Sequence, residues 1–339
     1  MKKRIGYILF LALITPVCFE IALRILGYTP YIQEQYYIVS KPDMCLKSSA
    51  DLGFKLGEGV YEVSMNGAPA YTATHRNGRR ITKNHIAHDS LRDVFIMGCS
   101  FTYGMGVIDS VSFPYQIQQR FPQLDVHNFG VPGFGTVQSY LQLKKEIEKG
   151  NTPDLVLVNF CDFHHERNSL TPIFRKSLTL GYERSNDEAK RQLAKSKFPY
   201  IKNGKLASVD YNDLYTNWMG RETFAAVQYF QSISDERATA KLDVEGNSEV
   251  IFRKMRELCD EHHIQFAVTG LTQTSATYAF LERLVESSDI HTVDITLDLA
   301  SNEYNQLPYD SHPNGKAHEF FAEKISEKIA LWIASLEAD

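Results

Sequence analysis

Cysteine is scarce in this sequence, and no charge of one sign dominates it. Its five cysteines are too few and too scattered for a disulfide scaffold or a zinc ribbon, so structural, mostly buried thiols are expected. Lysine and arginine number 36 against 41 aspartates and glutamates, which leaves a net charge of −5 without any basic stripe. This balance excludes a dedicated nucleic-acid-binding protein. With 43% hydrophobic and 23% charged residues, the 339-residue chain has the composition of a globular protein.

Nucleotide-binding motifs are missing as well. The glycine-rich stretch has the spacing Gly130-x-x-Gly133-x-Gly135, which differs from G-x-G-x-x-G, and no G-K-[ST] occurs. No cofactor is therefore expected. The G-x-S-x-G elbow of α/β-hydrolases is not met either, because Thr102 stands where its second glycine belongs.

The histidines do not have the spacing of a metal site. Residues 164–166 read "HHE", which is not H-E-x-x-H, and no third ligand is evident beside them. Two further pairs, His85/His88 and His262/His263, likewise do not match the spacing of a metal-binding motif. We therefore expect no metal and interpret these histidines as surface or pocket residues.

The N-terminus carries the one long apolar run. "MKKR" precedes an apolar stretch that reaches Leu26 and spans roughly 33 Å as a helix, enough for a bilayer core of about 30 Å. Glu20 and Arg24 are spaced i, i+4 and can pair near the far interface. A cleaved signal peptide is the alternative, but no small-x-small site follows the apolar region. The basic residues predict that residues 1–27 are an uncleaved anchor, with the remainder outside the cytoplasm.

Two kinds of pattern follow the anchor. Residues 28–90 contain short alternating stretches such as "VYEVSMNG", which predict a small β-rich accessory region packed beside the main domain. Residues 91–339 alternate apolar bursts such as "LVLVNF" with helical periods, which predicts a three-layer α/β domain with a flavodoxin-like parallel sheet. An interval at about 165–248 breaks this rhythm and predicts an insertion with its own helices. The other helices are expected at 112–121, 136–149, 249–263, 275–287 and in the final segment.

Three separate segments carry candidate chemistry. Ser100 follows the apolar run of "DVFIMGCSFTYGMG", at the sheet edge where open α/β folds place ligands, although a serine there is also a common helix cap. In "YDSHPNGKAH", Asp310 and His312 are spaced i, i+2, so the carboxylate can orient the ring toward Ser100. The competing interpretation of "DSHPN" is a helix start. Gly133, in "HNFGVPGFGT", lets the backbone approach a reacting centre and present an N–H group.

In this order and context, these segments resemble the SGNH (GDSL-type) hydrolase superfamily over residues 93–335, and the anchor resembles those of envelope-facing members. The resemblance implies that Ser100 is the nucleophile and that Asp310 and His312 complete a triad. The backbone N–H groups of Ser100 and Gly133 would form the oxyanion hole. Cys99 replaces the usual Asp of the first block.

The third block departs from the family pattern. It usually supplies an Asn as a second oxyanion donor, but here the text is "NFCDFHHERN". His164 is nearest in register, and Asn168 has the matching chemical type. The two are therefore almost equal candidates for the second oxyanion donor.

The resemblance implies a membrane-anchored serine esterase or acyltransferase that acts on acyl esters. The envelope location favours O-acyl groups of polysaccharides as substrates by family analogy, with a lipid or small ester as the alternative. A rival from another class is a non-catalytic envelope binding or assembly protein on the same fold, which the departure in the third block supports.

Overall fold

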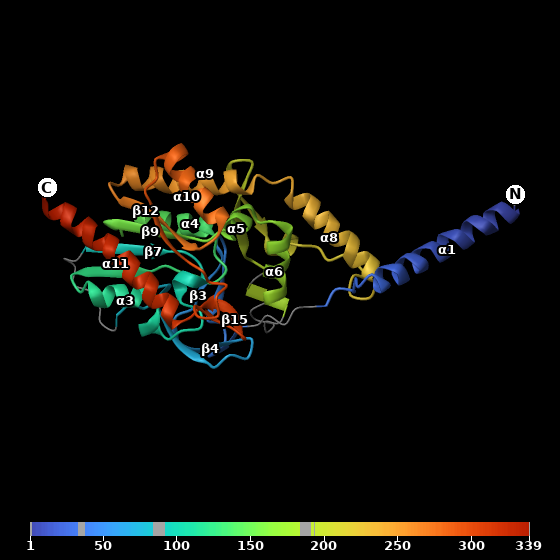
Figure 1. The fold of residues 1–339 in the computed structure, drawn as a ribbon, viewed down its shortest axis with the longest axis horizontal. Helices are drawn as coiled ribbons and strands as arrows, with labels where there is room; N and C mark the ends of the chain where they lie inside the picture. Colours follow the sequence, from blue (N-terminus) through green and yellow to red (C-terminus); the bar gives the residue numbers. More distant parts are fainter. Residues whose placement is uncertain (1, 33–37, 84–91, 184–190, 193, 339) are drawn as a thin grey trace.

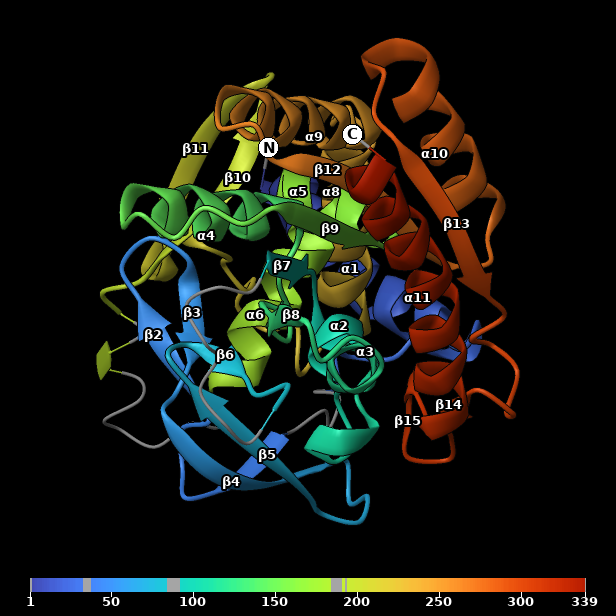
Figure 2. The same ribbon diagram turned by 90° about the vertical axis from the view of Figure 1, so that its left-hand side faces the viewer.

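A nine-stranded, mostly parallel sheet organises the chain. The computed structural model describes residues 2–32, 38–83, 92–183, 191–192 and 194–338. The sheet order is β1-β4-β5-β6-β8-β7-β9-β12-β13, and Figure 2 shows it running from β13 to β4. Five strands form its parallel part: β7 (Arg92–Met97), β8 (Leu124–Asn128), β9 (Leu155–Phe160), β12 (Gln265–Thr272) and β13 (Thr292–Leu297). Their order, second-first-third-fourth-fifth, is flavodoxin-like and confirms the predicted fold class.

The apolar bursts of the sequence become the central strands because helices cover both faces of the sheet. All six residues of β9, "LVLVNF", are buried. One face carries α3 (Phe113–Arg120) and α11 (Gly315–Ala338), and the other carries α4 (Thr136–Glu148), α9 (Val244–Glu261) and α10 (Ser275–Ser288). The ends of α3, α4 and α10 lie within one residue of the predicted ranges, whereas α9 begins five residues before the predicted start at 249.

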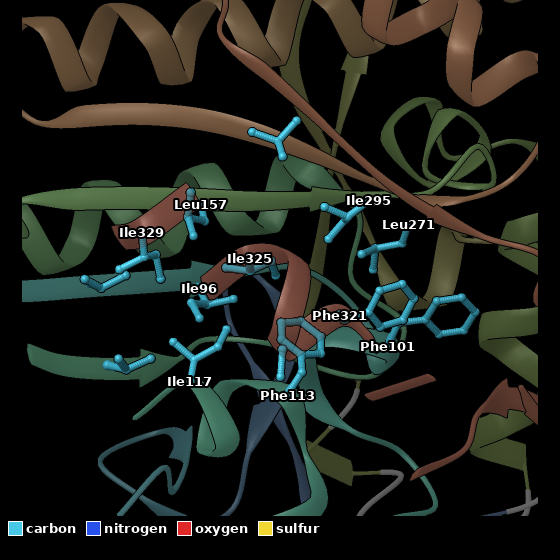
Figure 3. Packing of buried hydrophobic residues seen from close by; sticks show 14 of the residues in the cluster. Ile96, Phe101, Phe113, Ile117, Leu157, Leu271, Ile295, Phe321, Ile325 and Ile329 are labelled. Atoms are coloured by element: carbon cyan, nitrogen blue, oxygen red, sulfur yellow. The ribbon is translucent and has the colours of Figure 1, made fainter. Parts of the chain in front are cut away.

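The packing of α11 shows how one helical face closes the core. Phe321, Ile325 and Ile329 recur along one side of the helix and lie against Ile96 and Leu157 of the sheet (Figure 3). At about 25 cal/mol per Å² of buried apolar surface, side chains of this size each contribute roughly 1.5–3 kcal/mol. The final helix therefore belongs to the main core.

The N-terminal strands extend the central sheet. The antiparallel strands are β1 (Ile38–Lys41), β4 (Gly59–Met65), β5 (Tyr71–Arg76) and β6 (Arg79–Arg80), while β2 (Leu46–Ser49) and β3 (Gly53–Leu56) pair separately. Arg80 pairs with Asn128, which joins β6 to β8. The expected β-rich stretch is thus present. We expected it to pack beside the main domain, but its strands instead extend the edge of the central sheet.

The interval between β9 and α9 contains helices and also a hairpin. Its elements are α5 (His164–Ser169), α6 (Pro172–Glu183), β10 (Lys197–Lys202), β11 (Lys205–Asp210), the short η2 (Tyr211–Asp213) and α8 (Ala225–Thr239). The helices agree with the predicted insertion, whereas the β10–β11 hairpin was not expected. Asn203 and Gly204 connect its strands with φ angles of 51° and 72°, which this residue pair adopts at low cost.

The N-terminal helix α1 (Lys2–Ile25) projects from the body of the molecule (Figure 1). Its segment Arg4–Ile25 is long and apolar enough to cross a membrane, judged by length and composition alone. Most of its side chains are exposed, and its last turns contact α8. Outside that junction, α1 therefore packs little against the rest of the described chain.

Candidate active site

Ser100 lies where the first parallel strand ends. Gly98 follows β7, and a Cβ there would lie 2.3 Å from the hydroxyl oxygen of Thr102, so only glycine allows this turn. The short helix α2 (Ser100–Tyr103) begins with Ser100, and Cys99 holds the N-cap position without a side-chain cap bond. The Ser100 hydroxyl is therefore not the helix cap. The side chain is only 4% exposed.

Asp310 and His312 form the pair that their spacing predicts. Both lie in the short strand β15 (Asp310–Pro313), which pairs with β14 (Asn305–Gln306). The Asp310 carboxylate accepts a hydrogen bond from the backbone N–H of His312 at 2.5 Å and also contacts ring atom Nδ1. The two side chains are largely buried. A ring proton on Nδ1 satisfies this contact with the carboxylate, and Nε2 is then the acceptor nitrogen of the neutral imidazole.

The Asp310–His312 pair, from near the C-terminal end of the chain, lies against α2, the helix that begins with Ser100. Helix α2 packs against β15, and the ring of His312 meets that of Phe101 edge-on, with 5.4 Å between centroids. Among the described residues, His312 has its hydrogen bonds to Asp310, and none joins its ring to the Ser100 hydroxyl. Such bonds are often long in ligand-free enzymes and shorten in the substrate complex.

A glutamine that sequence reasoning missed fixes β15 in place. Gln306 donates from Nε2 to the carbonyl of Met105 at 2.8 Å and to that of Pro313 at 3.0 Å. A Cβ at Gly106 would lie 2.0 Å from the same side chain. Gln306 therefore ties the loop after α2 to the strand that carries the Asp–His pair. No motif or spacing points to this residue, because its partners are backbone carbonyls.

The glycine-rich loop lies directly against α2. A Cβ at Gly130 would lie 2.3 Å from the backbone nitrogen of Tyr103, so a larger residue cannot stand there. The side chain of Asn128 accepts from the Gly130 N–H at 2.9 Å and donates to the Thr102 carbonyl at 3.1 Å. Gly133 has φ +82°, a conformation that favours glycine. Across the described residues, no hydrogen bond uses the backbone N–H of Ser100 or Gly133.

The Asn168 side chain has a structural role at the start of α4. It is fully buried, and its Oδ1 accepts from the backbone N–H groups of Thr136 and Val137, at 2.7 and 3.2 Å, where α4 begins. Its Nδ2 donates to the Ser248 hydroxyl at 3.0 Å. Because both ends of the amide are engaged, Asn168 serves as a cap for α4 supplied by another helix.

His164 and His165 are buried, which corrects the interpretation of them as surface or pocket residues. His165 shares a 2.9 Å hydrogen bond with Ser248, and burial lowers its pKa to about 4. Within the described part of the chain, neither ring nitrogen of His164 has a hydrogen-bond partner. His262 and His263 are exposed, and His85 and His88 lie outside the described residues.

His164 lies beside two thiols, although no third ligand was evident from the sequence. Its ring and the sulfurs of Cys99 and Cys161 lie within 4.8 Å of one another, and all three side chains are buried. Burial opposes ionisation of Cys99, but the Cys161 thiol, the His164 ring and the Arg167 charge hold its pKa well below the usual range. The pKa of Cys161 is raised by burial and by Cys99. Two thiols and an imidazole are donors for a soft metal ion, and the surrounding core seals them from solvent.

A second group of metal-type donors is already engaged. Asp125 contacts the Lys83 ammonium, and His127 shares hydrogen bonds with Asp93 at 2.8 Å and with Arg79 at 3.0 Å. The cations and the carboxylates satisfy one another in this cluster. It lies where β7 and β8 begin, at the edge of the sheet opposite Ser100.

Buried polar groups of the N-terminal strands bind α2 through hydrogen bonds. His75 shares hydrogen bonds with the Gly57 carbonyl at 3.0 Å and the Tyr103 hydroxyl at 2.8 Å. Burial lowers the pKa of His75 to about 4, so the ring is neutral at pH 7. Burial and the neighbouring Tyr71 raise the pKa of Tyr103 well above its usual value. These residues couple the β-rich stretch to α2, a link that the sequence pattern did not reveal.

The fold and the site define an α/β protein with a serine, an Asp–His pair and a glycine loop at the carboxyl edge of a flavodoxin-like sheet. No family model matches the chain, and no curated protein matches its sequence. Solved structures with a similar fold include the psychrotrophic esterase EstA from Pseudoalteromonas sp. (12% identity, TM-score 0.42, 72% of this chain and 99% of that one). Others are a member of the lipolytic G-D-S-L family from Veillonella parvula (10%, 0.39, 70% and 97%) and the acetylxylan esterase Axe2 from Geobacillus stearothermophilus (12%, 0.35, 70% and 94%).

These similar structures are GDSL-type lipolytic proteins and esterases.

Proposed function

We propose that this protein is a membrane-anchored serine esterase or acyltransferase that acts on acyl esters outside the cytoplasm. The observation that carries the proposal is the Asp310–His312 pair, which packs against the helix that begins with Ser100. The carboxylate bond to Nδ1 orients the ring and stabilises its charged form, so Nε2 can act as a base. The nucleophile, the base and the orienting acid are thereby supplied together.

The reaction proceeds in two halves. The Ser100 hydroxyl attacks the ester carbonyl carbon while His312 Nε2 takes its proton, and the oxygen of the tetrahedral intermediate becomes negative. The His312 imidazolium then protonates the leaving alkoxide, which leaves an acyl group on Ser100. Water attacks this group in hydrolysis, and a sugar hydroxyl attacks it in acyl transfer, with His312 again taking the proton.

The oxyanion is held by the backbone N–H groups of Ser100 and Gly133. The first group lies at the start of α2 and the second in the glycine-rich loop, and neither is used in the hydrogen bonds of the described residues. Donors that are fixed before the reaction begins stabilise charge that develops in the transition state. Asn168 acts as the α4 cap in this scheme, and His164 is the side chain left to test as a further donor.

The anchor is retained in the mature protein. Glu20 accepts hydrogen bonds from the backbone N–H groups of Ala225 and Ala226, at 2.9 and 2.8 Å, so it caps the start of α8. Arg24 donates to the Thr223 carbonyl at 2.9 Å. Cleavage after residue 20 would remove Glu20 from this junction. N-terminal sequencing should therefore find the original start, and a phosphatase fused at residue 339 should be active outside the cytoplasm.

Ester turnover by the purified full chain tests the catalytic proposal. The Ser100→Ala variant should lose turnover of a nitrophenyl acetate to background, while its thermal midpoint stays near that of wild type. Ser110, an exposed serine a short distance along the chain, offers a matched control, and Ser110→Ala should keep wild-type turnover. Full turnover in Ser100→Ala would refute the mechanism. Absence of turnover in wild type on acyl esters of every class would favour the binding-protein alternative.

A further inference from the structure

The junction between α1 and α8 brings part of the folded domain to the end of the anchor. Phe19 of α1 stacks on Phe230 of α8 with 5.6 Å between ring centroids. Tyr28, just after α1, meets Tyr229 edge-on at 5.0 Å. Figure 1 shows α8 running from the body to the base of α1. The first turns of α8 therefore lie level with the last turns of α1.

The length of α1 sets where this level falls. The 22 residues of Arg4–Ile25 span about 33 Å as a helix, against a hydrocarbon core of about 30 Å. With Arg4 at one surface, the other surface of the core falls within the last turns of α1. Glu20 and Arg24 pair there at 2.7 Å, as charged residues at a membrane surface do. The start of α8 is thus placed at the outer membrane–water interface.

Large apolar side chains are exposed at this level. Trp218 is 44% exposed, Met219 98%, Phe224 50% and Phe230 49%. They come from the turn before α8 and from its first two turns. An exposed apolar group of this size on a folded protein marks an interaction surface. Tryptophan in particular prefers the region where lipid headgroups meet the acyl chains.

The turn that presents these side chains is rigidly built. The N–H of Phe224 donates to the Gly220 carbonyl at 2.8 Å, and the N–H of Trp218 donates to the side chain of Gln231 at 3.1 Å. Gly220 has φ +88°, which favours glycine. Buried Arg221 lies 3.9 Å from the ring centre of Tyr31, so the turn is also fastened to the segment after α1. Met219 is therefore held outward by the fold.

We propose that Trp218, Met219, Phe224 and Phe230 form a membrane-docking surface that enters the outer leaflet beside α1. The inference rests on the membrane anchor of the proposed function. The occupant is a bilayer, because the membrane-spanning helix α1 ends at this junction. The exposed side chains also continue the apolar surface of α1 through the Phe19–Phe230 contact. Docking at two places, α1 and this surface, holds the domain in one orientation to the membrane.

Tryptophan fluorescence tests the proposal because the chain has only two tryptophans. Trp332→Phe leaves Trp218 as the only reporter, and Trp218→Phe leaves Trp332, in the last half of α11, as the matched control. Figure 1 places that end of α11 at the opposite end of the molecule from α1. The full chain is placed in phosphatidylcholine nanodiscs with and without bromine on the upper part of the acyl chains. Trp218 should lose most of its emission in the brominated lipid, and Trp332 should keep its emission.

A second pair of variants separates docking from folding. Met219→Asp should restore most of the Trp218 emission in brominated lipid, because a carboxylate resists entry into the leaflet, while the thermal midpoint stays unchanged. Val285→Asp, at an exposed apolar position on α10, should leave the quenching as it was.

Unquenched Trp218 in a chain that stays in the membrane after carbonate extraction would overturn the docking surface and leave the anchor intact. If Trp218 is protected from aqueous iodide but not quenched by bromine, a protein partner covers the surface, and this too would overturn the proposal. Release of the chain by carbonate would refute the anchor of the proposed function.

Discussion

Arg80 links the N-terminal strands to the segment that follows Ser100, and replacing it tests that link. Its side chain is buried, and it donates to the carbonyl groups of Tyr103, Gly104 and Val107, at 3.0, 2.5 and 2.6 Å. Its Nε also donates to Asp109 at 2.8 Å. The guanidinium thus closes the carboxyl end of α2, where a positive charge is favourable and the last carbonyls lack helical partners.

Arg80→Met keeps much of the side-chain volume and removes every one of these bonds. Breaking a buried ion pair from one side costs roughly 3–5 kcal/mol, because the remaining groups stay buried without a partner. Asp109 retains the backbone N–H of Thr74, at 3.0 and 3.1 Å, which places the expected loss at the lower end of that range. Against a total stability of about 5–15 kcal/mol the loss is large. With an unfolding entropy of about 2.1 cal/mol/K per residue, a loss of about 3 kcal/mol lowers the Tm of a chain of this size by roughly 4 °C.

Thermal unfolding and ester kinetics on the same variants give the comparison. Arg76→Met, at an exposed position in β5, is the matched control and should leave both unchanged. Because Arg80 holds the residues that follow Ser100 in α2, kcat should fall by up to about 10²-fold with a smaller change in KM. An Arg80→Met protein with wild-type Tm and kcat would refute the coupling between the two regions.

Three further predictions concern residues around α2. The pKa of His75, about 4 in the folded chain through burial and about 6.5 when unfolded, predicts full stabilisation above pH 6.5 and its loss as the pH falls toward 4. Urea unfolding of wild type should show this loss, of about 3 kcal/mol, and His75→Gln should show less of it. Gly130→Ala places a Cβ 2.3 Å from the backbone nitrogen of Tyr103, so both Tm and kcat should fall, and an unchanged kcat would contradict the described approach of the loop. Asn168→Ala should lower stability by about 1 kcal/mol with kcat retained, whereas a donor role for His164 predicts a loss of kcat of about 10²–10³ in His164→Ala with KM unchanged.

The strands and the Asp–His pair could be predicted because their signals are local. An apolar run such as "LVLVNF" is buried on both sides only in a covered parallel sheet, and residues spaced i, i+2 in a strand project to the same side. The β10–β11 hairpin had a local signal as well, the Asn203–Gly204 turn, which the charged and aromatic composition around it obscured.

The supports of the site could not be predicted in the same way. Arg80, Gln306 and Asn168 bind backbone groups that are distant in the chain. Some of these groups need a side-chain partner only because a helix begins or ends there. A backbone carbonyl carries no identity in the sequence, so neither the partners nor the burial of these side chains has a pattern to detect. The same holds for Cys99, Cys161 and His164, whose side chains come together only in the folded chain.

Covalent labelling of Ser100 tests the central claim most directly. The purified full chain is incubated with a fluorophosphonate, and the modified peptide is located by mass spectrometry. The mechanism predicts one adduct per chain, on Ser100, whose formation slows strongly in Asp310→Asn because the orienting carboxylate is lost. An adduct on another serine, or an unmodified wild-type chain, would contradict it.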